Sequence, residues 1–363
     1  MKQQWSIVPA ALVAAAVLAA PATARAQGCL LTRNMAPILG SQVSPYLQPG
    51  EWQVNANYRQ FTADHQYQGT ELSPAVTALG TNVISKMKYL ETSGTYAFST
   101  QWNLSVTAPI ILDASSNRAL PATVAGSPRF EHSSTGLGDM TIGMRRWFLS
   151  CDKNPHQNFA VTGAVKMPTG NSEVMDAFPN ALGTDIKDRY VDQSIQLGDS
   201  GWGFGISAEG FKQFGPVVTF VSGVYMFNPK DQNDTYSPPA LLNPVGPQNV
   251  AEVQRYNTVS DSYLFRGGVG FGVPKVTGLS ATFATRLEGV PVNDAFGDTA
   301  GFRRPGFYVT IEPGVVFAHG PASFYLNVPF RVHQNVKKSL GFARDSTFAD
   351  HMLLLGTTVR IGG

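Results

Sequence analysis

Three groups of residues in this 363-residue chain have types that could carry out chemistry. His132-Ser133-Ser134 places a base beside hydroxyl nucleophiles, as an outer-membrane lipase would, but no GxSxG segment accompanies it. The glycines of Gly136–Asp139 lack the spacing of a phosphate-binding loop, and no helix pattern follows them. The six histidines show no metal-ligand spacing. We therefore expect no cofactor and no metal, and we keep a lipase-type enzyme only as an alternative.

Charged side chains at alternating positions are the remaining candidates for a site. They lie on the polar faces of segments whose opposite faces are apolar, a pattern typical of strands. If the strands form a barrel in lipid, the polar faces line its lumen. The charges then either pair and stiffen the barrel or line a path for a solute, and both roles stay open. The predicted lumen-lining set is Arg59, Glu91, Asp139, Arg145, Lys166, Glu209, Arg266, Arg286, Glu288, Glu312 and Arg331.

Period-two alternation predicts the elements that must position these charges. We expect about twelve strands, most of them as long as the ~9–11 residues that a tilted strand needs to cross a bilayer. The predicted strands cover residues 51–62, 84–98, 101–112, 137–149, 157–167, 202–213, 216–227, 259–273, 278–290, 304–317, 321–335 and 348–362.

The connections between these strands alternate between long and short, which is typical of outer-membrane barrels with long outer loops and short periplasmic turns. Tyr190–Leu197 also resembles a strand, but counting it would put long loops on both sides. We therefore assign it to a loop or to an extension of the next strand, which gives twelve strands, and keep fourteen as the alternative. The loop 228–258 is rich in Pro and Asn, cannot form a ladder, and is a candidate constriction or cover of the mouth. The long loops cover residues 63–83, 113–136, 168–201, 228–258, 291–303 and 336–347.

The segment TGLGDMTIGMRRWFLSC, residues 135–151, predicts a single strand that descends to the periplasmic side. Met140 to Met144 contribute the lipid-facing side chains, whereas Asp139 and Arg145 face the lumen. Arg146 can reach the membrane edge beside Phe148, which suits an interfacial aromatic girdle.

Composition and the N-terminal residues limit the classes of protein to which the chain can belong. Residues 1–26 combine Lys2, an apolar run and a small-residue site ending at Ala26, which predicts a cleaved signal peptide. Its removal leaves 25 basic and 25 acidic residues, so charge gives no argument for nucleic acid. Only 14% of residues are charged, against ~25% in soluble domains, while 36 are Gly and 11% are aromatic. These features favour a transmembrane barrel over 51–363 rather than a soluble periplasmic sandwich.

The two cysteines fall on one side of this topology. Cys29 lies in a periplasmic N-terminal segment, 27–50, and Cys151 lies in a periplasmic turn. Two cysteines on the same side of an exported protein predict a disulfide. Free thiols and acylation of Cys29 stay open as alternatives.

Three short motifs carry a resemblance to a known family. They are Gly136–Asp139, Pro168–Gly170 at the end of the next strand, and Gln196–Trp202 leading into a later strand. Their order resembles the outer-membrane transporter family associated with the degradation of phenol and other aromatic compounds. The resemblance implies a β-barrel transporter and no catalytic residues.

Together these observations predict an all-β, antiparallel, up-and-down barrel in the outer membrane. We expect it to pass small molecules, hydrophobic or aromatic ones among them, by passive uptake or efflux through a narrow or partly plugged lumen. Its expected partners are outer-membrane lipid, a small-molecule solute and the barrel assembly machinery. A barrel without transport, with a structural or surface-binding role, is the alternative.

Overall fold

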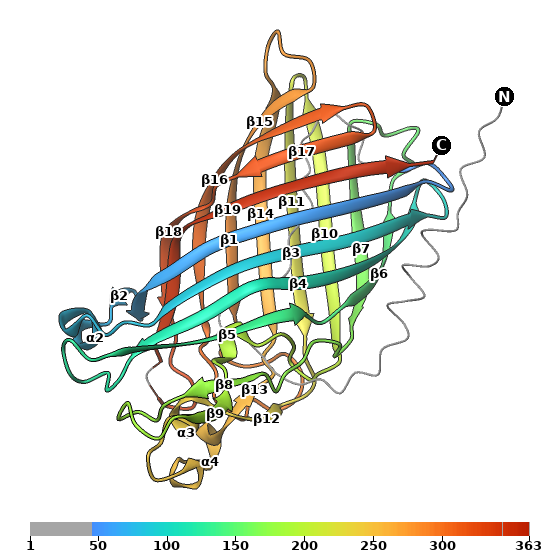
Figure 1. Cartoon of the computed structure of the whole chain (residues 1–363). Helices are drawn as coiled ribbons and strands as arrows, with labels where there is room; N and C mark the ends of the chain where they lie inside the picture. The colour runs from blue at the N-terminus through green and yellow to red at the C-terminus, as the bar shows by residue number, and fades with distance from the viewer. Residues whose placement is uncertain (1–45, 343, 363) are drawn as a thin grey trace, which may run out of the picture.

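The alternating segments form one antiparallel sheet that closes on itself (Figure 1). This structure is a computed structural model, and it describes residues 46–342 and 344–362. The first and last strands pair from Trp52↔Ile361 to Tyr67↔Ser346, and this pairing closes the barrel. The barrel has twelve strands, so the predicted fold class is confirmed. The predicted signal peptide and Cys29 lie outside the described residues.

Ten barrel strands are continuous, and two are each built from consecutive pieces. β5 and β6 are separated by residues 138–140, and β17 and β18 are separated by residues 328–329. The barrel strands are β1 (Trp52–Gln68), β3 (Ile84–Ala97), β4 (Trp102–Ala119), β5 (Arg129–Leu137), β6 (Thr141–Trp147), β7 (Gln157–Lys166), β10 (Gly203–Phe214), β11 (Val217–Phe227), β14 (Ser262–Gly272), β15 (Leu279–Val290), β16 (Gly306–His319), β17 (Ala322–Asn327), β18 (Phe330–Val336) and β19 (Ser346–Ile361).

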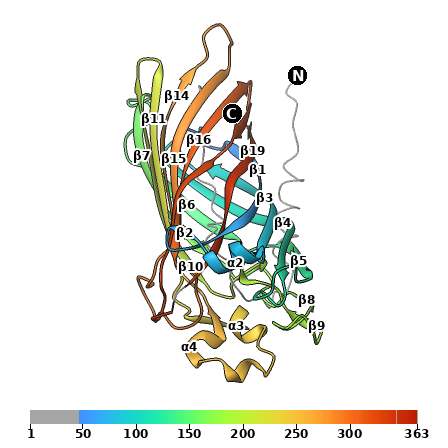
Figure 2. The ribbon, with the colours of Figure 1, turned by 90° about the vertical axis from the view of Figure 1, so that its left-hand side faces the viewer.

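The long connections emerge together at one end of the barrel, which we call the long-loop end; the other is the short-turn end (Figures 1 and 2). No helix in the described part of the chain is long and apolar enough to cross a membrane. The short elements of the long connections are β2 (Glu71–Leu72), α2 (Pro74–Leu79), β8 (Met175–Phe178), β9 (Lys187–Tyr190), η1 (Gln193–Ile195), β12 (Gln232–Tyr236), α3 (Pro238–Leu241), η2 (Pro247–Asn249), α4 (Glu252–Arg255) and β13 (Tyr256–Thr258).

Several boundaries differ from those predicted, mostly at the long-loop end. β4 runs to Ala119 and β5 begins at Arg129, so the predicted loop 113–136 is mostly ladder. Ser116, for example, pairs with both Ser85 and His132. Hydrogen bonding continues there although the apolar alternation stops. The prediction that loop 228–258 cannot form a ladder is also wrong, because β12 pairs with β13.

The outward face of the barrel is apolar, as a lipid-facing surface requires. Ile142 and Met144 are exposed, and the Arg146 guanidinium lies 5.3 Å from the Phe148 ring centroid on the same face. Met140 is an exception: it was predicted to face lipid but is only 6% exposed. The break between β5 and β6 interrupts the alternation at this residue, so the single strand predicted over 137–149 is wrong.

Candidate functional site

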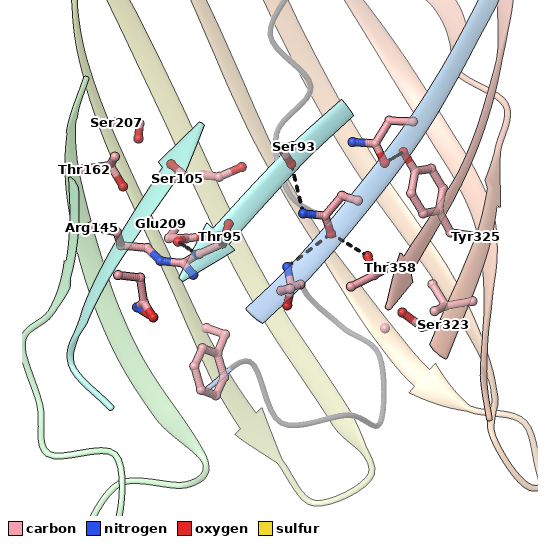
Figure 3. A pocket seen from close by; sticks show the side chains of 18 of the residues that line it. Ser93, Thr95, Ser105, Arg145, Thr162, Ser207, Glu209, Ser323, Tyr325 and Thr358 are labelled. Atoms are coloured by element: carbon pink, nitrogen blue, oxygen red, sulfur yellow. Dashed lines mark hydrogen bonds and ion pairs between the residues drawn. The ribbon is translucent and has the colours of Figure 1, made fainter. Parts of the chain in front are cut away.

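A polar cavity occupies the half of the barrel next to the short turns. Its volume is about 970 Å³, and its lining reaches Pro155, Pro216 and Pro274 in those turns. Figure 3 shows hydroxyl side chains converging on it from several strands. Serine, threonine and tyrosine hydroxyls both donate and accept hydrogen bonds, so they can hold water or a polar group of a solute in many orientations. The labelled hydroxyl residues are Ser93, Thr95, Ser105, Thr162, Ser207, Ser323, Tyr325 and Thr358.

An ion pair crosses the cavity wall. Arg145 Nη1 on β6 lies 2.9 Å from Glu209 Oε1 on β10, and both side chains line the cavity. Glu91 lines it too, and its Oε1 accepts a hydrogen bond of 3.4 Å from the amide of Asn57. Three of the eleven predicted lumen-lining residues therefore surround this cavity.

Aromatic side chains narrow the short-turn end of the cavity. The buried ring of Trp147 contacts Tyr46 edge to face, with 5.3 Å between the ring centroids. Phe211 packs against both rings. The Tyr46 hydroxyl donates a hydrogen bond of 2.9 Å to the backbone oxygen of Asn154. The residues immediately before β1 are thus held against the inside of the barrel at this end.

Five more of the predicted residues form a buried network of ion pairs beyond the cavity. Arg266 donates from Nη2 to Glu312 Oε1 at 2.7 Å, and Arg59 Nη2 lies 3.4 Å from Glu288 Oε1. Arg286 connects the two pairs by contacting both carboxylates. All five side chains are at most 3% exposed. We call Arg59, Arg266, Arg286, Glu288 and Glu312 the charged network.

An apolar cluster closes the interior at the long-loop half. Val191, Ile195 and Leu197 come from the loop between β9 and β10 and are at most 5% exposed. They pack in one cluster with inward side chains of neighbouring strands, from β16 through β18, β19, β1 and β3 to β4, so this loop segment lies inside the barrel. We call residues 191–199 the inserted segment. The cluster also contains Phe61, Tyr89, Tyr308, Phe348 and Met352 from the barrel strands β1, β3, β16 and β19.

Asp139 fixes the base of the inserted segment. Its two carboxylate oxygens accept backbone hydrogen bonds of 2.9 Å from Gly170 and Asp199. Gly198 lies so close to Gly170 that an added Cβ would stand 2.3 Å from the Gly170 oxygen. The side chain of Asp199 also pairs with Lys166. We call these contacts of Asp139, Gly170, Gly198 and Asp199 the latch.

The latch joins the three motifs that carried the family resemblance. Asp139 ends the Gly136–Asp139 motif, Gly170 ends Pro168–Gly170, and Gly198 lies within Gln196–Trp202. The sequence showed these motifs without showing that they meet. The break between β5 and β6 is what directs Asp139 toward the inserted segment.

The far end of the inserted segment is held by arginines. Asp192 pairs with Arg118, and its Oδ1 lies 3.8 Å from Arg304 Nη1. Burial opposes ionisation of this carboxyl, but the two guanidiniums outweigh it and hold the pKa of Asp192 well below its usual range. These three residues were not predicted: Arg118 and Asp192 lie in predicted loops, and Arg304 is the first residue of a predicted strand.

The remaining predicted residues have other surroundings. Arg331 pairs with Asp350 and donates to the Tyr67 hydroxyl at 3.0 Å, near the long-loop end.

Cys151 carries a free, buried thiol beside the backbone oxygen of Thr100, 3.1 Å away. The structure therefore does not support the predicted disulfide, whose other half, Cys29, lies outside the described residues.

The residues considered for a lipase-type site hold the inserted segment instead. His132 Nε2 accepts the backbone N–H of Asp192 at 3.2 Å, and the Ser134 hydroxyl donates to the backbone oxygen of Ile195. Another loop-end histidine, His65 in β1, is half-buried, and its Nδ1 lies 3.1 Å from Asp64 and 3.4 Å from Asp350. Within the described ranges, no group of three or more His, Cys, Asp or Glu side chains is placed to hold a metal.

Comparison with known proteins agrees with this architecture. Residues 39–209 match the family described as "Putative MetA-pathway of phenol degradation", which confirms the resemblance drawn from the motifs. No curated protein matches the chain.

One solved structure shows the same fold, and two others resemble this one more weakly. An outer membrane channel from Pseudomonas putida F1 aligns with a TM-score of 0.56 and 15% identity, over 90% of this chain and 100% of that chain. The β domain of the Bordetella autotransporter BrkA has a TM-score of 0.42 and 10% identity, over 86% of this chain and all of that one. The Ralstonia pickettii toluene transporter TbuX has a TM-score of 0.40 and 9% identity, over 87% and 90% of the two chains.

Proposed function

Because residues 39–209 match a family whose description concerns phenol degradation, we propose that this barrel is an outer-membrane channel for small hydrophobic or aromatic molecules. The observation that carries the proposal is the cavity of about 970 Å³ inside a closed barrel. This volume lies within the ~300–1,000 Å³ of typical small-molecule sites and exceeds what one phenol-sized solute fills. Export by a cleaved signal peptide and insertion by the barrel assembly machinery belong to the same proposal.

The cavity lining suits release of such a solute rather than tight binding. Hydroxyl and amide groups give many weak hydrogen bonds to a phenolic oxygen and leave room for water. Passage requires sites that hold a solute weakly enough to let it leave. A solute arriving from the long-loop end must first displace the apolar cluster, so transport needs movement of the inserted segment.

The test is the uptake of labelled phenol by cells whose outer membrane carries the chain, together with current traces in a planar bilayer. We expect the chain to raise the initial uptake rate over cells without it and to give small current steps. A matched comparison uses a twelve-stranded barrel of unrelated sequence at equal abundance. No current at any voltage and no increase in uptake would support the non-transporting barrel instead.

A further inference from the structure

A second cavity lies among the loops at the long-loop end, on the far side of the inserted segment from the polar cavity. Its volume is about 530 Å³. Three arginines line it, Arg118 from β4, Arg304 just before β16 and Arg344 just before β19. Apolar side chains of the loops form the rest of the wall, among them Leu242 and Phe302. The cavity thus combines strong positive charge with an apolar surface, and we call it the arginine pocket.

Arg344 is the least satisfied of these arginines. It is 6% exposed, and its Nη1 donates to Gln254 Oε1 at 2.9 Å. Its Nε and Nη2 are buried, and no residue in the described part of the chain accepts a hydrogen bond from them. A buried guanidinium without acceptors is unfavourable, so these two donors favour an acceptor beyond those that residues 46–342 and 344–362 supply.

A second cation, the guanidinium of Arg304, lies close to Arg344 and makes an anion beside the two more favourable. The Arg304 and Arg344 guanidiniums lie 5.1 and 4.6 Å from the centroid of the same Phe302 ring. Burial and the charge of Arg304 together lower the pKa of Arg344 to about 10, although Asp345 opposes the shift. Such a shift shows that the positive charge at this position is poorly compensated.

The carboxylates of the pocket do not balance its arginines. Asp192 pairs with Arg118 at the floor, and Asp345 Oδ1 lies 3.9 Å from Arg304 Nε. Asp345 also accepts a hydrogen bond of 2.6 Å from Gln66, which holds it on the β1 side. The residues that line the pocket thus include three arginines and one carboxylate, Asp345.

We propose that the arginine pocket binds a small organic anion, with its carboxylate on Arg344 and its apolar body against Phe302 and Leu242. A planar guanidinium binds a carboxylate through two parallel hydrogen bonds, and Nε with Nη2 is the edge of Arg344 that no described residue occupies. Both atoms are buried, so the side chain turns toward the pocket when the anion binds. The proposal rests on the proposed function and narrows it, because it makes aromatic carboxylates a class of solute collected at the outer mouth.

The experiment measures benzoate binding to the purified full-length chain in detergent by titration calorimetry. We expect saturable binding that R344Q weakens by about tenfold or more, the cost of losing a charge-assisted bidentate contact. The matched control is K338Q, which removes an exposed cation at the same end and should leave the affinity unchanged. Benzyl alcohol, which has the ring without the charge, and acetate, which has the charge without the ring, should both bind more weakly than benzoate.

Equal benzoate affinity of R344Q and the unaltered chain overturns the proposal, as does the absence of saturable binding. If R344Q does not fold to a heat-modifiable barrel, R344K serves instead. It keeps the charge but loses the planar edge, so its benzoate affinity should fall, and an unchanged affinity overturns the proposal. Phenol uptake without benzoate binding would overturn the proposal for the arginine pocket and leave the channel function supported. Benzoate binding without any uptake or current would overturn the channel function and leave the arginine pocket supported.

Discussion

At the scale of single residues, alternation assigns a charge to one face of a strand only where the strand is regular. Arg266, Arg286, Glu288 and Glu312 could be predicted to share one face because β14, β15 and β16 pair without a register shift. Their mutual contacts could not be predicted, since alternation gives a side chain its face and not its height along the barrel. Asp192 was not placed in the lumen, because its segment was assigned to a loop and alternation says nothing about how a loop folds.

The charged network gives a prediction about stability. Glu312 accepts from Arg266 and from Asn327 at 2.8 Å, so E312Q leaves the buried Arg266 guanidinium without its counter-charge and Arg286 with Glu288 alone. Removing one partner from a buried pair typically costs ~3–5 kcal/mol, and we expect a loss of that size in the free energy of unfolding. Reversible urea unfolding from lipid vesicles measures it.

The control for this prediction is the same chemical change in an exposed pair. Asp113 Oδ2 lies 2.9 Å from Lys88 Nζ, and the two side chains are 53% and 48% exposed. Water and salt screen such a pair, so D113N should leave the free energy of unfolding unchanged. Equal effects of D113N and E312Q would show that the network contributes no more than a surface pair.

At the scale of elements, the inserted segment is the main feature that strand patterns did not reveal. Tyr190–Leu197 was correctly excluded from the barrel strands, because a thirteenth strand would have put long loops on both sides. Its position inside the barrel depends on contacts between residues far apart in sequence, such as Asp139 with Asp199. The motif Gln196–Trp202 was the one available signal, and it indicated a family rather than a position.

The latch predicts the effect of a single methyl group. An alanine Cβ at position 198 would stand 2.3 Å from the Gly170 oxygen and 2.6 Å from Asp139 Oδ1, so G198A forces the inserted segment away from the wall. Overpacking of this kind typically costs ~1–3 kcal/mol. We expect G198A to unfold at lower urea and to pass a larger current in a planar bilayer than the unaltered chain.

Gly163 supplies the matched control for this change. It lies in β7, and an added Cβ there would meet nothing within 4 Å. G163A should therefore keep both the unfolding midpoint and the current of the unaltered chain. If G198A conducts no better than G163A, the latch does not hold the channel closed.

At the scale of the whole molecule, the barrel is divided into two compartments. The polar cavity reaches the short turns and the arginine pocket lies among the long loops, while the apolar cluster separates them. The count of twelve strands could be predicted because loop lengths constrain parity. The division could not, since it depends on how one loop folds back into the lumen.

The free energy that keeps the inserted segment in the lumen, which we call the closed state, comes from the contacts of that segment. Burying a side chain such as Ile195 or Leu197 is worth roughly 1.5–3 kcal/mol, and the Asp139 hydrogen bonds add to this. The open state is therefore a minor population without a solute. A ligand shifts this population only by binding the open state more tightly than the closed one.

This division predicts that a reagent added from the long-loop end reaches the polar cavity only slowly. Ser207 lines that cavity, so S207C introduces a thiol behind the apolar cluster as seen from the long loops. A charged methanethiosulfonate reagent added to intact cells should modify S207C slowly, and S207C combined with G198A much faster. K338C, exposed at the long-loop end, should react quickly with or without G198A. Chains without the added cysteine give the background from Cys29 and Cys151, and mass spectrometry counts the modified thiols. If S207C alone reacts as fast as K338C, the interior is continuous from the outer mouth, and the inserted segment is not the barrier that limits transport.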